Sequence, residues 1–159
     1  MKIGVISDTH SLPLPKKLLD FLSTVDLIIH AGDICDTDTL KSLQKIKEVK
    51  AVHGNMCDAQ LKKKLPLKEY VECQGVRIGI FHGHVGDAID ALSNAIQQFK
   101  EEPVDIVIFG HSHHAFNKQI DKVLFFNPGS PNDVVKARFF SYGLIEIRDG
   151  KFQASIVKL

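Results

Sequence analysis

The sequence predicts an α/β (α+β) fold, and three observations support this prediction. Segments with strand character alternate with segments of helical spacing through most of the chain. Roughly the last fifty residues instead hold four strand-like segments with turns between them, which is typical of antiparallel sheet. A chain of 159 residues is long enough for one buried core, and no linker or internal repeat interrupts it. We therefore expect a single domain that spans residues 1–159.

The first half of the chain is predicted to alternate strand and helix. Its opening segment is rich in β-forming residues and ends in polar ones, as buried strands of α/β sheets do. Prolines interrupt the chain before the first helical segment. In the second helical segment Leu40, Leu43 and Ile46 mark one face, and lysines cover the other. The predicted strands are at 1–8, 25–29 and 49–52, and the predicted helices are at 16–22 and 39–47.

The second half is predicted to hold a hairpin, one helix and then mostly strands. Gln74–Gly75, Asp121–Lys122 and Asp149–Gly150 are turn-forming pairs between strand-like segments. Residues 87–99 place apolar side chains near one face, which favours a helix. The predicted strands of this half are at 68–73, 76–81, 104–109, 114–120, 123–127, 139–147 and 152–157.

Composition excludes several classes of protein. Lys and Arg total 20 against 19 for Asp and Glu, so the net charge of +1 gives no basic footprint for nucleic acid. Nucleic acid is therefore disfavoured as a partner, although the net charge does not exclude a local basic patch. The apolar runs are too short to span a bilayer, so we expect no membrane association. Three cysteines without a CxxC pair, and no signal peptide, favour a reduced, cytoplasmic protein.

Polar residues that could bind a metal follow five of the predicted strands. Because ligands gather at the carboxyl ends of strands in α/β sheets, these residues are expected to converge on one point. Glycines beside them permit tight turns and a close approach of the backbone. The segments are Asp8-Thr9-His10, Gly32-Asp33, Gly54-Asn55, His82-Gly83-His84 and Gly110-His111-Ser112-His113.

Spacing and chemistry indicate which of these side chains act together. Asp8 and His10 are two residues apart, as are His111 and His113, so each pair can address one site from an extended segment. A set of carboxylates, an amide and several imidazoles suits borderline divalent ions such as Mn, Fe, Co, Ni or Zn. Hard Mg or Ca sites would contain more oxygens and fewer imidazoles. The residues alone therefore predict a transition-metal site.

Other polar residues near these segments have simpler interpretations. His30 ends an apolar strand, which favours a buried packing role over ligation. His114 should point away from its neighbour His113 and is not expected to be a ligand. Asp36 is interpreted as a helix N-cap, with Thr37 as the alternative. Cys57 lacks a neighbouring base and is interpreted as an inert, partly buried thiol.

These ordered segments resemble the signature of the calcineurin-like metallophosphoesterase superfamily. The small size of the chain, Asn127-Pro128-Gly129-Ser130 and the later Ser141-Tyr142-Gly143 resemble its compact bacterial and archaeal phosphodiesterase branch. The resemblance extends from the first strand to about Ile147, which is nearly the whole chain. As an ordered set the segments are specific, whereas each one alone would be a weak signal.

The resemblance implies a four-layer α-β-β-α sandwich with a two-metal phosphoesterase site. One metal would be held by Asp8, His10, Asp33 and His113, and the other by Asp33, Asn55, His82 and His111, with Asp33 as the bridge. Two cations about 3.5–4 Å apart can lower the pKa of a bridging water and clamp the phosphoryl oxygens. The attacking group would be this metal-bound hydroxide. Mn is the first choice of metal, with Ni, Fe, Co and Zn as alternatives.

The segment after Asn55 departs from the family pattern. Many members continue Gly-Asn with a histidine assigned to substrate binding or to protonation of the leaving group, but here Met56 and Cys57 follow. His84 is the nearest substitute by sequence, and we place it and Asn55 near the substrate. An enzyme without a good general acid should favour esters whose leaving groups depart without a proton, such as nitrophenolates.

The sequence therefore predicts a phosphodiesterase that hydrolyses small phosphodiesters, with two alternatives. The eukaryotic retromer subunit resembles this branch and is a protein-binding scaffold with an altered metal site, but here every expected ligand type is present. A phosphomonoesterase or a nuclease could use the same metal centre. The short chain leaves little room for a cap domain or a long groove, which favours small substrates. Compact members often self-associate, so a homo-oligomer is also open.

Overall fold

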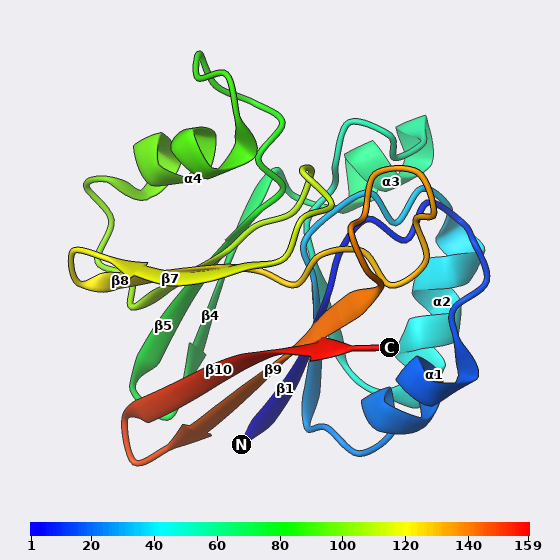
Figure 1. Ribbon diagram of the computed structural model, residues 1–159, viewed down its shortest axis with the longest axis horizontal. Helices are drawn as coiled ribbons and strands as arrows, with labels where there is room; N and C mark the ends of the chain where they lie inside the picture. Colours follow the sequence, from blue (N-terminus) through cyan, green and yellow to red (C-terminus); the bar gives the residue numbers. More distant parts are fainter.

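The computed structural model describes residues 1–159 and contains two five-stranded sheets (Figure 1). The first sheet has the strand order β10 (Lys151–Lys158), β9 (Ser141–Arg148), β1 (Lys2–Ile6), β2 (Leu27–His30) and β3 (Val49–Ala51). The second sheet has the order β4 (Lys68–Cys73), β5 (Val76–Phe81), β6 (Ile106–Ile108), β8 (Val123–Asn127) and β7 (Phe116–Ile120). The four helices are α1 (Lys16–Leu22), α2 (Thr37–Ile46), α3 (Ala59–Lys64) and α4 (Ala91–Phe99).

The sheets and helices form four layers, as the family resemblance implied. One apolar cluster lies between the two sheets and includes Ile29 of the first and Ile80 of the second. A second cluster joins the first sheet to α1, α2 and α3, and a third packs α4 through Phe99 against the second sheet. Figure 1 accordingly shows α1, α2 and α3 on one side of the sheets and α4 on the other. The predicted α-β-β-α sandwich is confirmed.

Parallel pairing brings the carboxyl ends of the central strands to one end of each sheet. In the first sheet β1 pairs parallel with β2, and β2 with β3. In the second sheet β5 pairs parallel with β6, and β6 with β8. The three predicted hairpin turns are confirmed, because β4–β5, β7–β8 and β9–β10 are antiparallel neighbours.

Helix α3 was not predicted, because a six-residue helix has too few apolar positions to show a periodicity. Its single buried residue is Leu61, and it begins where the Asp58 carboxylate accepts a hydrogen bond from the Leu61 amide at 2.7 Å. The predicted cap of α2 is confirmed at Asp36, which accepts from the Thr39 amide at 2.7 Å. No helix in the structure has both the length and the apolar character needed to cross a membrane.

Several predicted elements begin too early in the sequence. The helix predicted from residue 87 begins at Ala91, because the side chain of Asp90 caps it. The strand predicted from His114 begins at Phe116, after a loop in which His113 has a positive φ angle of 59°. The strand predicted at 139–147 begins at Ser141, whose hydroxyl donates to the Pro128 carbonyl at 2.7 Å. Strands predicted at 25–29 and 104–109 are shorter, at Leu27–His30 and Ile106–Ile108.

Candidate metal centre

The loops after the parallel strands carry two adjacent groups of potential metal ligands. Each group has three side chains with one ligand atom apiece, and these atoms lie within 4.8 Å of one another. All the predicted His and Asp ligands fall into these groups, which are Asp8, His10 and His113 in the first and Asp33, His82 and His111 in the second. Both groups therefore draw on both sheets, since Asp8 and Asp33 follow β1 and β2 while the other sheet supplies His82, His111 and His113.

Asp8 lies close to histidines of both groups. Its Oδ1 atom lies 3.3 Å from His113 Nε2 and 4.0 Å from His10 Nε2. The same oxygen lies 3.9 Å from Nε2 of His82, which belongs to the second group. The Asp8 side chain is fully buried, so bulk solvent screens little of its charge from these imidazoles. A buried carboxylate among imidazoles is well suited to a cation.

Asp33 is held beside His82 by contacts from two loops. Its Oδ2 lies 3.2 Å from His82 Nε2, and its Oδ1 accepts a hydrogen bond from the Met56 amide at 2.8 Å. Burial alone would raise the pKa of Asp33, but His82 and the Met56 amide outweigh burial and lower this pKa to about 2. Burial disfavours protonated His82, yet Asp33 and Asp8 raise its pKa. A metal ion at His82 Nε2 would compete with a proton for this nitrogen, so its binding is expected to depend on pH.

Three of the histidines direct Nε2 toward the cluster and Nδ1 toward a protein partner. His82 Nδ1 lies 2.8 Å from the Ala31 carbonyl, His10 Nδ1 lies 3.6 Å from Cys35 Sγ, and His113 Nδ1 contacts the Asp133 carboxylate. His82 Nε2 is buried and makes no hydrogen bond of normal geometry. A buried ring nitrogen with no hydrogen-bond partner is costly unless another ligand takes its lone pair. The donor set and its orientation therefore fit a divalent metal.

Backbone hydrogen bonds between loops fix the ligands relative to one another. The Asp8 amide donates to the Gly32 carbonyl, and the His10 amide to the Asp33 carbonyl, each at 3.0 Å. The Gly110 amide donates to the His82 carbonyl, also at 3.0 Å. The backbone at these loops is unusual, since five candidate ligands have positive φ angles between 48° and 68°, which non-glycine residues rarely adopt. They are Asp8, His10, Asp33, His111 and His113, and the hydrogen bonds between the loops help to hold this conformation.

Asn55, the seventh predicted ligand, lies on the rim of the cluster. It is exposed and sits between Gly54, whose backbone packs against Asp33, and Met56, whose amide donates to Asp33. Its carbonyl accepts a hydrogen bond from the Lys62 ammonium at 2.7 Å. The Asn55 loop is therefore adjacent to the second group, and helix α3 supplies one of its contacts.

His84 lies beside the second group, as its sequence position suggested. Its ring centroid is 5.3 Å from that of His82 and 6.4 Å from that of His111. Burial, together with the neighbouring His82 and His53, lowers the pKa of His84 to about 4. Its Nδ1 is buried without a hydrogen-bond partner. The structure thus places a neutral imidazole beside the cluster.

The remaining histidines lie outside the ligand groups. His30 is fully buried, its Nε2 lies 3.1 Å from the Thr9 hydroxyl, and burial lowers its pKa to about 3. His114 is exposed, and its Nε2 donates to the Lys136 carbonyl at 3.1 Å. His53 is partly exposed with its ring centroid 5.8 Å from that of His84. The packing interpretation of His30 and the exclusion of His114 agree with these positions.

Two residues that contact the ligands were missed from the sequence. Asp133 lies against His113, and Cys35 lies 3.6 Å from His10. Burial and the charge of Asp33 raise the pKa of Cys35 to about 12, so it remains a neutral thiol. Ser130 of the Asn-Pro-Gly-Ser segment donates its hydroxyl hydrogen to the Asp8 carbonyl at 2.8 Å, so this segment packs against the first ligand group.

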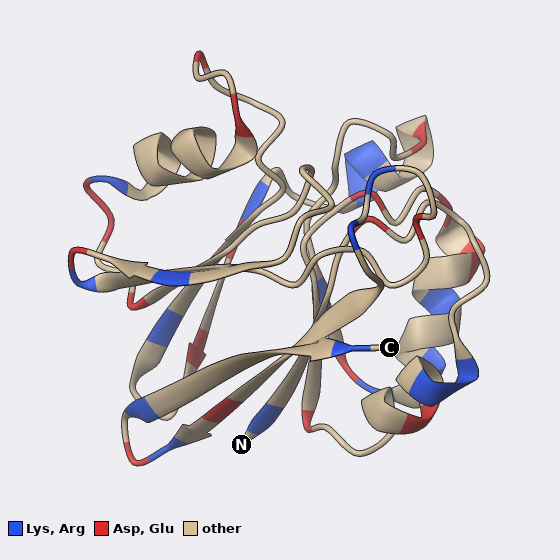
Figure 2. Ribbon diagram, in the orientation of Figure 1, with Lys and Arg blue, Asp and Glu red and all other residues tan.

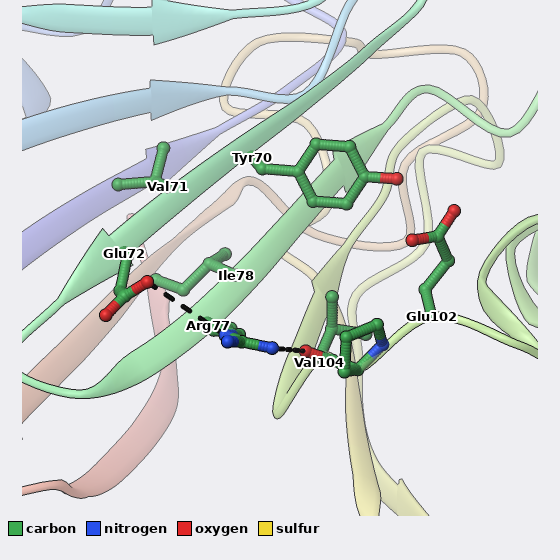
Figure 3. Close-up of a pocket in the computed structure, with 8 residues that line it drawn as sticks. Tyr70, Val71, Glu72, Arg77, Ile78, Glu102 and Val104 are labelled. Carbon is green, nitrogen blue, oxygen red and sulfur yellow. Dashed lines mark hydrogen bonds and ion pairs between the residues drawn. The ribbon is translucent and has the colours of Figure 1, made fainter.

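A pocket of about 460 Å³ lies away from the ligand groups (Figure 3). It is formed by β4, β5 and the segment before β6, where Arg77 contacts Glu72 and the Pro103 carbonyl. These residues lie toward the amino ends of β5 and β6, whereas His82 follows the carboxyl end of β5. A smaller hollow of about 210 Å³ adjoins the cluster and is lined by His113, His114, Ala115, Arg138 and Phe139. Only the smaller hollow touches a candidate ligand.

Comparison with known proteins relates this geometry to one superfamily. The calcineurin-like phosphoesterase superfamily domain model matches residues 1–150. A probable metallophosphoesterase of Methanocaldococcus jannaschii, MJ0623, is 38% identical, and the alignment covers 100% of this chain and 82% of that protein. The phosphodiesterase MJ0936 of the same organism is 30% identical over 81% of this chain and 83% of its own length. Vps29 of Entamoeba histolytica, solved in complex with Zn²⁺, is 29% identical and has a TM-score of 0.77 over 99% of each chain.

The matched region contains every loop that contributes to the cluster, from Asp8 to Asp133. The similarity therefore covers the candidate centre as well as the two sheets that position it. On this combined evidence, the chain belongs to the calcineurin-like phosphoesterase superfamily and resembles its small archaeal and bacterial members.

Proposed function

We propose that this protein is a divalent-metal-dependent phosphodiesterase that hydrolyses small phosphodiesters. The observation that supports this most directly is the pair of adjacent His/Asp groups, with three imidazoles whose Nε2 atoms face buried carboxylates. A non-catalytic scaffold would not need these buried groups to be oriented in this way. The 30% identity to a phosphodiesterase supports the diester specificity.

The proposed ligands follow the family pattern. By that pattern, Asp8, His10, Asp33 and His113 would hold one ion, and Asp33, Asn55, His82 and His111 the other. Mn is our first choice, and Ni, Fe, Co and Zn suit the same donors. When bound, such a pair of ions supplies water activation at neutral pH and charge neutralisation of the phosphoryl oxygens.

The protein's own side chains would bind and orient the substrate. We place Asn55 and His84 at the phosphoryl group, since both adjoin the second ligand group. One substituent of a phosphodiester could occupy the hollow beside His113, where Arg138 offers a positive charge and Phe139 an apolar ring. Lys and Arg are distributed over both sheets and several helices (Figure 2), which favours a small substrate over a nucleic acid.

Hydrolysis of bis(p-nitrophenyl) phosphate by chelator-treated protein tests this function. Mn, Ni, Co, Mg or Zn is added back singly, and metal content is measured for each sample. We expect turnover only with added metal. Asp33→Ala removes a carboxylate that contacts His82, so it should lower metal content and activity together. Full activity of this variant with two bound ions would contradict the mechanism.

The same assay separates the alternative functions. Turnover of p-nitrophenyl phosphate alone would identify a phosphomonoesterase. Metal binding without turnover of either ester would instead favour a protein-binding scaffold. We would then expect removal of the metal to change the affinity for a protein partner. The presence of both carboxylates and four histidines in the two groups is why we rank catalysis first.

A further inference from the structure

Asp133 links one candidate ligand to the loop that follows the Asn-Pro-Gly-Ser segment. Its Oδ2 contacts Nδ1 of His113 in a hydrogen-bonded pair. On the opposite side of the ring, His113 Nε2 lies 3.3 Å from Asp8 Oδ1 and 3.2 Å from His10 Nε2. The imidazole is therefore held between a carboxylate at its outer edge and the ligand group at its inner edge. His113 is itself buried.

The Asp133 carboxylate has little freedom to rotate. Its Oδ1 accepts hydrogen bonds from the amides of Val135 at 2.7 Å and Lys136 at 3.2 Å. The Asp133 amide donates to the Ser130 hydroxyl at 3.1 Å, and that hydroxyl donates to the Asp8 carbonyl. With Oδ1 occupied by two backbone amides, Oδ2 remains for His113. The loop thus presents one carboxylate oxygen in a fixed direction.

We propose that Asp133 is a positioning residue that keeps the His113 proton on Nδ1 and leaves the Nε2 lone pair for a metal ion. A carboxylate accepts a hydrogen bond but cannot donate one when ionised, so it selects the Nδ1–H form of the ring. Such a partner also makes the imidazole a stronger ligand. Among the three oriented histidines only His113 has a carboxylate at Nδ1, since His82 contacts a backbone carbonyl and His10 a thiol. The inference rests on the proposed metal-dependent function.

Asp133→Asn changes the hydrogen-bonding character of this side chain with almost no change in shape. The amide oxygen would keep the bonds from Val135 and Lys136, so the NH₂ group would face His113 and donate to Nδ1. The proton would then move to Nε2, the atom that a metal needs. We expect the affinity for Co²⁺ to fall by about 10–100-fold. Asp133→Glu restores a carboxylate and should recover part of this loss.

Two measurements on the full chain test the proposal. Calorimetric and visible-absorption titration with Co²⁺ gives affinity and stoichiometry, and ¹⁵N NMR of the metal-free protein reports the protonated nitrogen of His113. Asp105→Asn is the matched control, since Asp105 Oδ2 also accepts a backbone amide, that of Arg77, but contacts no histidine. The control should bind Co²⁺ like the wild type. Equal thermal midpoints for the two metal-free variants would exclude loss of folding as the cause of any difference.

The outcomes distinguish this inference from the proposed function. A wild-type protein that takes up no Co²⁺ contradicts both. Uptake by the wild type with unchanged affinity in Asp133→Asn contradicts the inference alone. A proton on Nε2 of His113 in the metal-free wild type overturns the inference even if the variant does not fold.

Discussion

Two glycines allow the backbone to approach the candidate ligands more closely than any other residue could. A Cβ atom at Gly54 would lie 2.1 Å from Asp33 Oδ1. At Gly110 it would lie 2.0 Å from the Ser7 hydroxyl and 2.9 Å from Asp8 Oδ2. Real Cβ atoms do not approach other atoms this closely, so a side chain here would displace the carboxylates. These glycines are part of the geometry of the site.

Gly54→Ala should therefore disable the centre without removing any ligand. We expect the carboxylate of Asp33 to shift from His82 and the metal affinity to fall by roughly 10–100-fold, as it does when the surroundings of a ligand are disturbed. Titration with Mn²⁺ and the bis(p-nitrophenyl) phosphate assay measure the two effects. Gly75→Ala is the control, because a Cβ there meets no atom within 4 Å. Its φ angle of 81° carries a conformational cost of its own, so that cost is measured as a change in thermal midpoint.

At the scale of elements, α3 connects the Asn55 loop to the first sheet. Leu61 packs into the cluster beneath this helix, and Lys62 donates to the Asn55 carbonyl. The last turn of α3 is Lys62-Lys63-Lys64, and three consecutive lysines in a sequence indicate only a solvated segment, not a helix. A helix this short has little stability of its own, so its cap and its one buried leucine determine whether it forms. We infer that α3 positions the rim of the site.

Comparing Asp58→Ala with Asp90→Ala tests this role of α3. Both carboxylates cap a helix by accepting a backbone amide, that of Leu61 in α3 and that of Ser93 in α4. Loss of either cap should cost about 1 kcal/mol of unfolding free energy, measured by urea denaturation. Only Asp58→Ala should also raise KM for the diester, since only α3 contacts the Asn55 loop. Equal KM changes in the two variants would refute a specific role for α3.

At the scale of the whole molecule, the buried imidazole of His30 makes stability depend on pH. Burial lowers the pKa of His30 from 6.5 to about 3, so between these values the unfolded chain binds a proton that the folded metal-free protein does not. Stability is therefore expected to fall as pH decreases below 6.5, by up to about 1.4 kcal/mol per pH unit from this group. NMR titration of the His30 ring measures its pKa, and urea denaturation at each pH measures the free energy of unfolding. A His30 midpoint near 6.5 would contradict this account.

The sequence predicted the fold well wherever local pattern determines structure. Alternating apolar segments and turn pairs such as Gln74–Gly75 identified every strand. Residue type at strand ends, together with the family resemblance, gave the seven candidate ligands. Strand order was less accessible: β9 pairs with β1 and β8 with β6, which depends on burial of whole strands rather than on neighbours in the chain. Asp133 was missed because it lies 20 residues after its partner His113, in a loop with no periodicity.

The left-handed backbone at the candidate ligands also bears on how this chain can change over generations. Aspartate and histidine at positive φ cost roughly 1 kcal/mol each relative to glycine. Mutations of His10 or His113 to glycine would recover some of this backbone energy, so selection for stability alone would favour losing these side chains. A lineage that had abandoned metal chemistry would be expected to drift toward glycine and asparagine at these positions. The stability of the fold alone therefore does not account for the side chains at these five positions, whereas metal binding would.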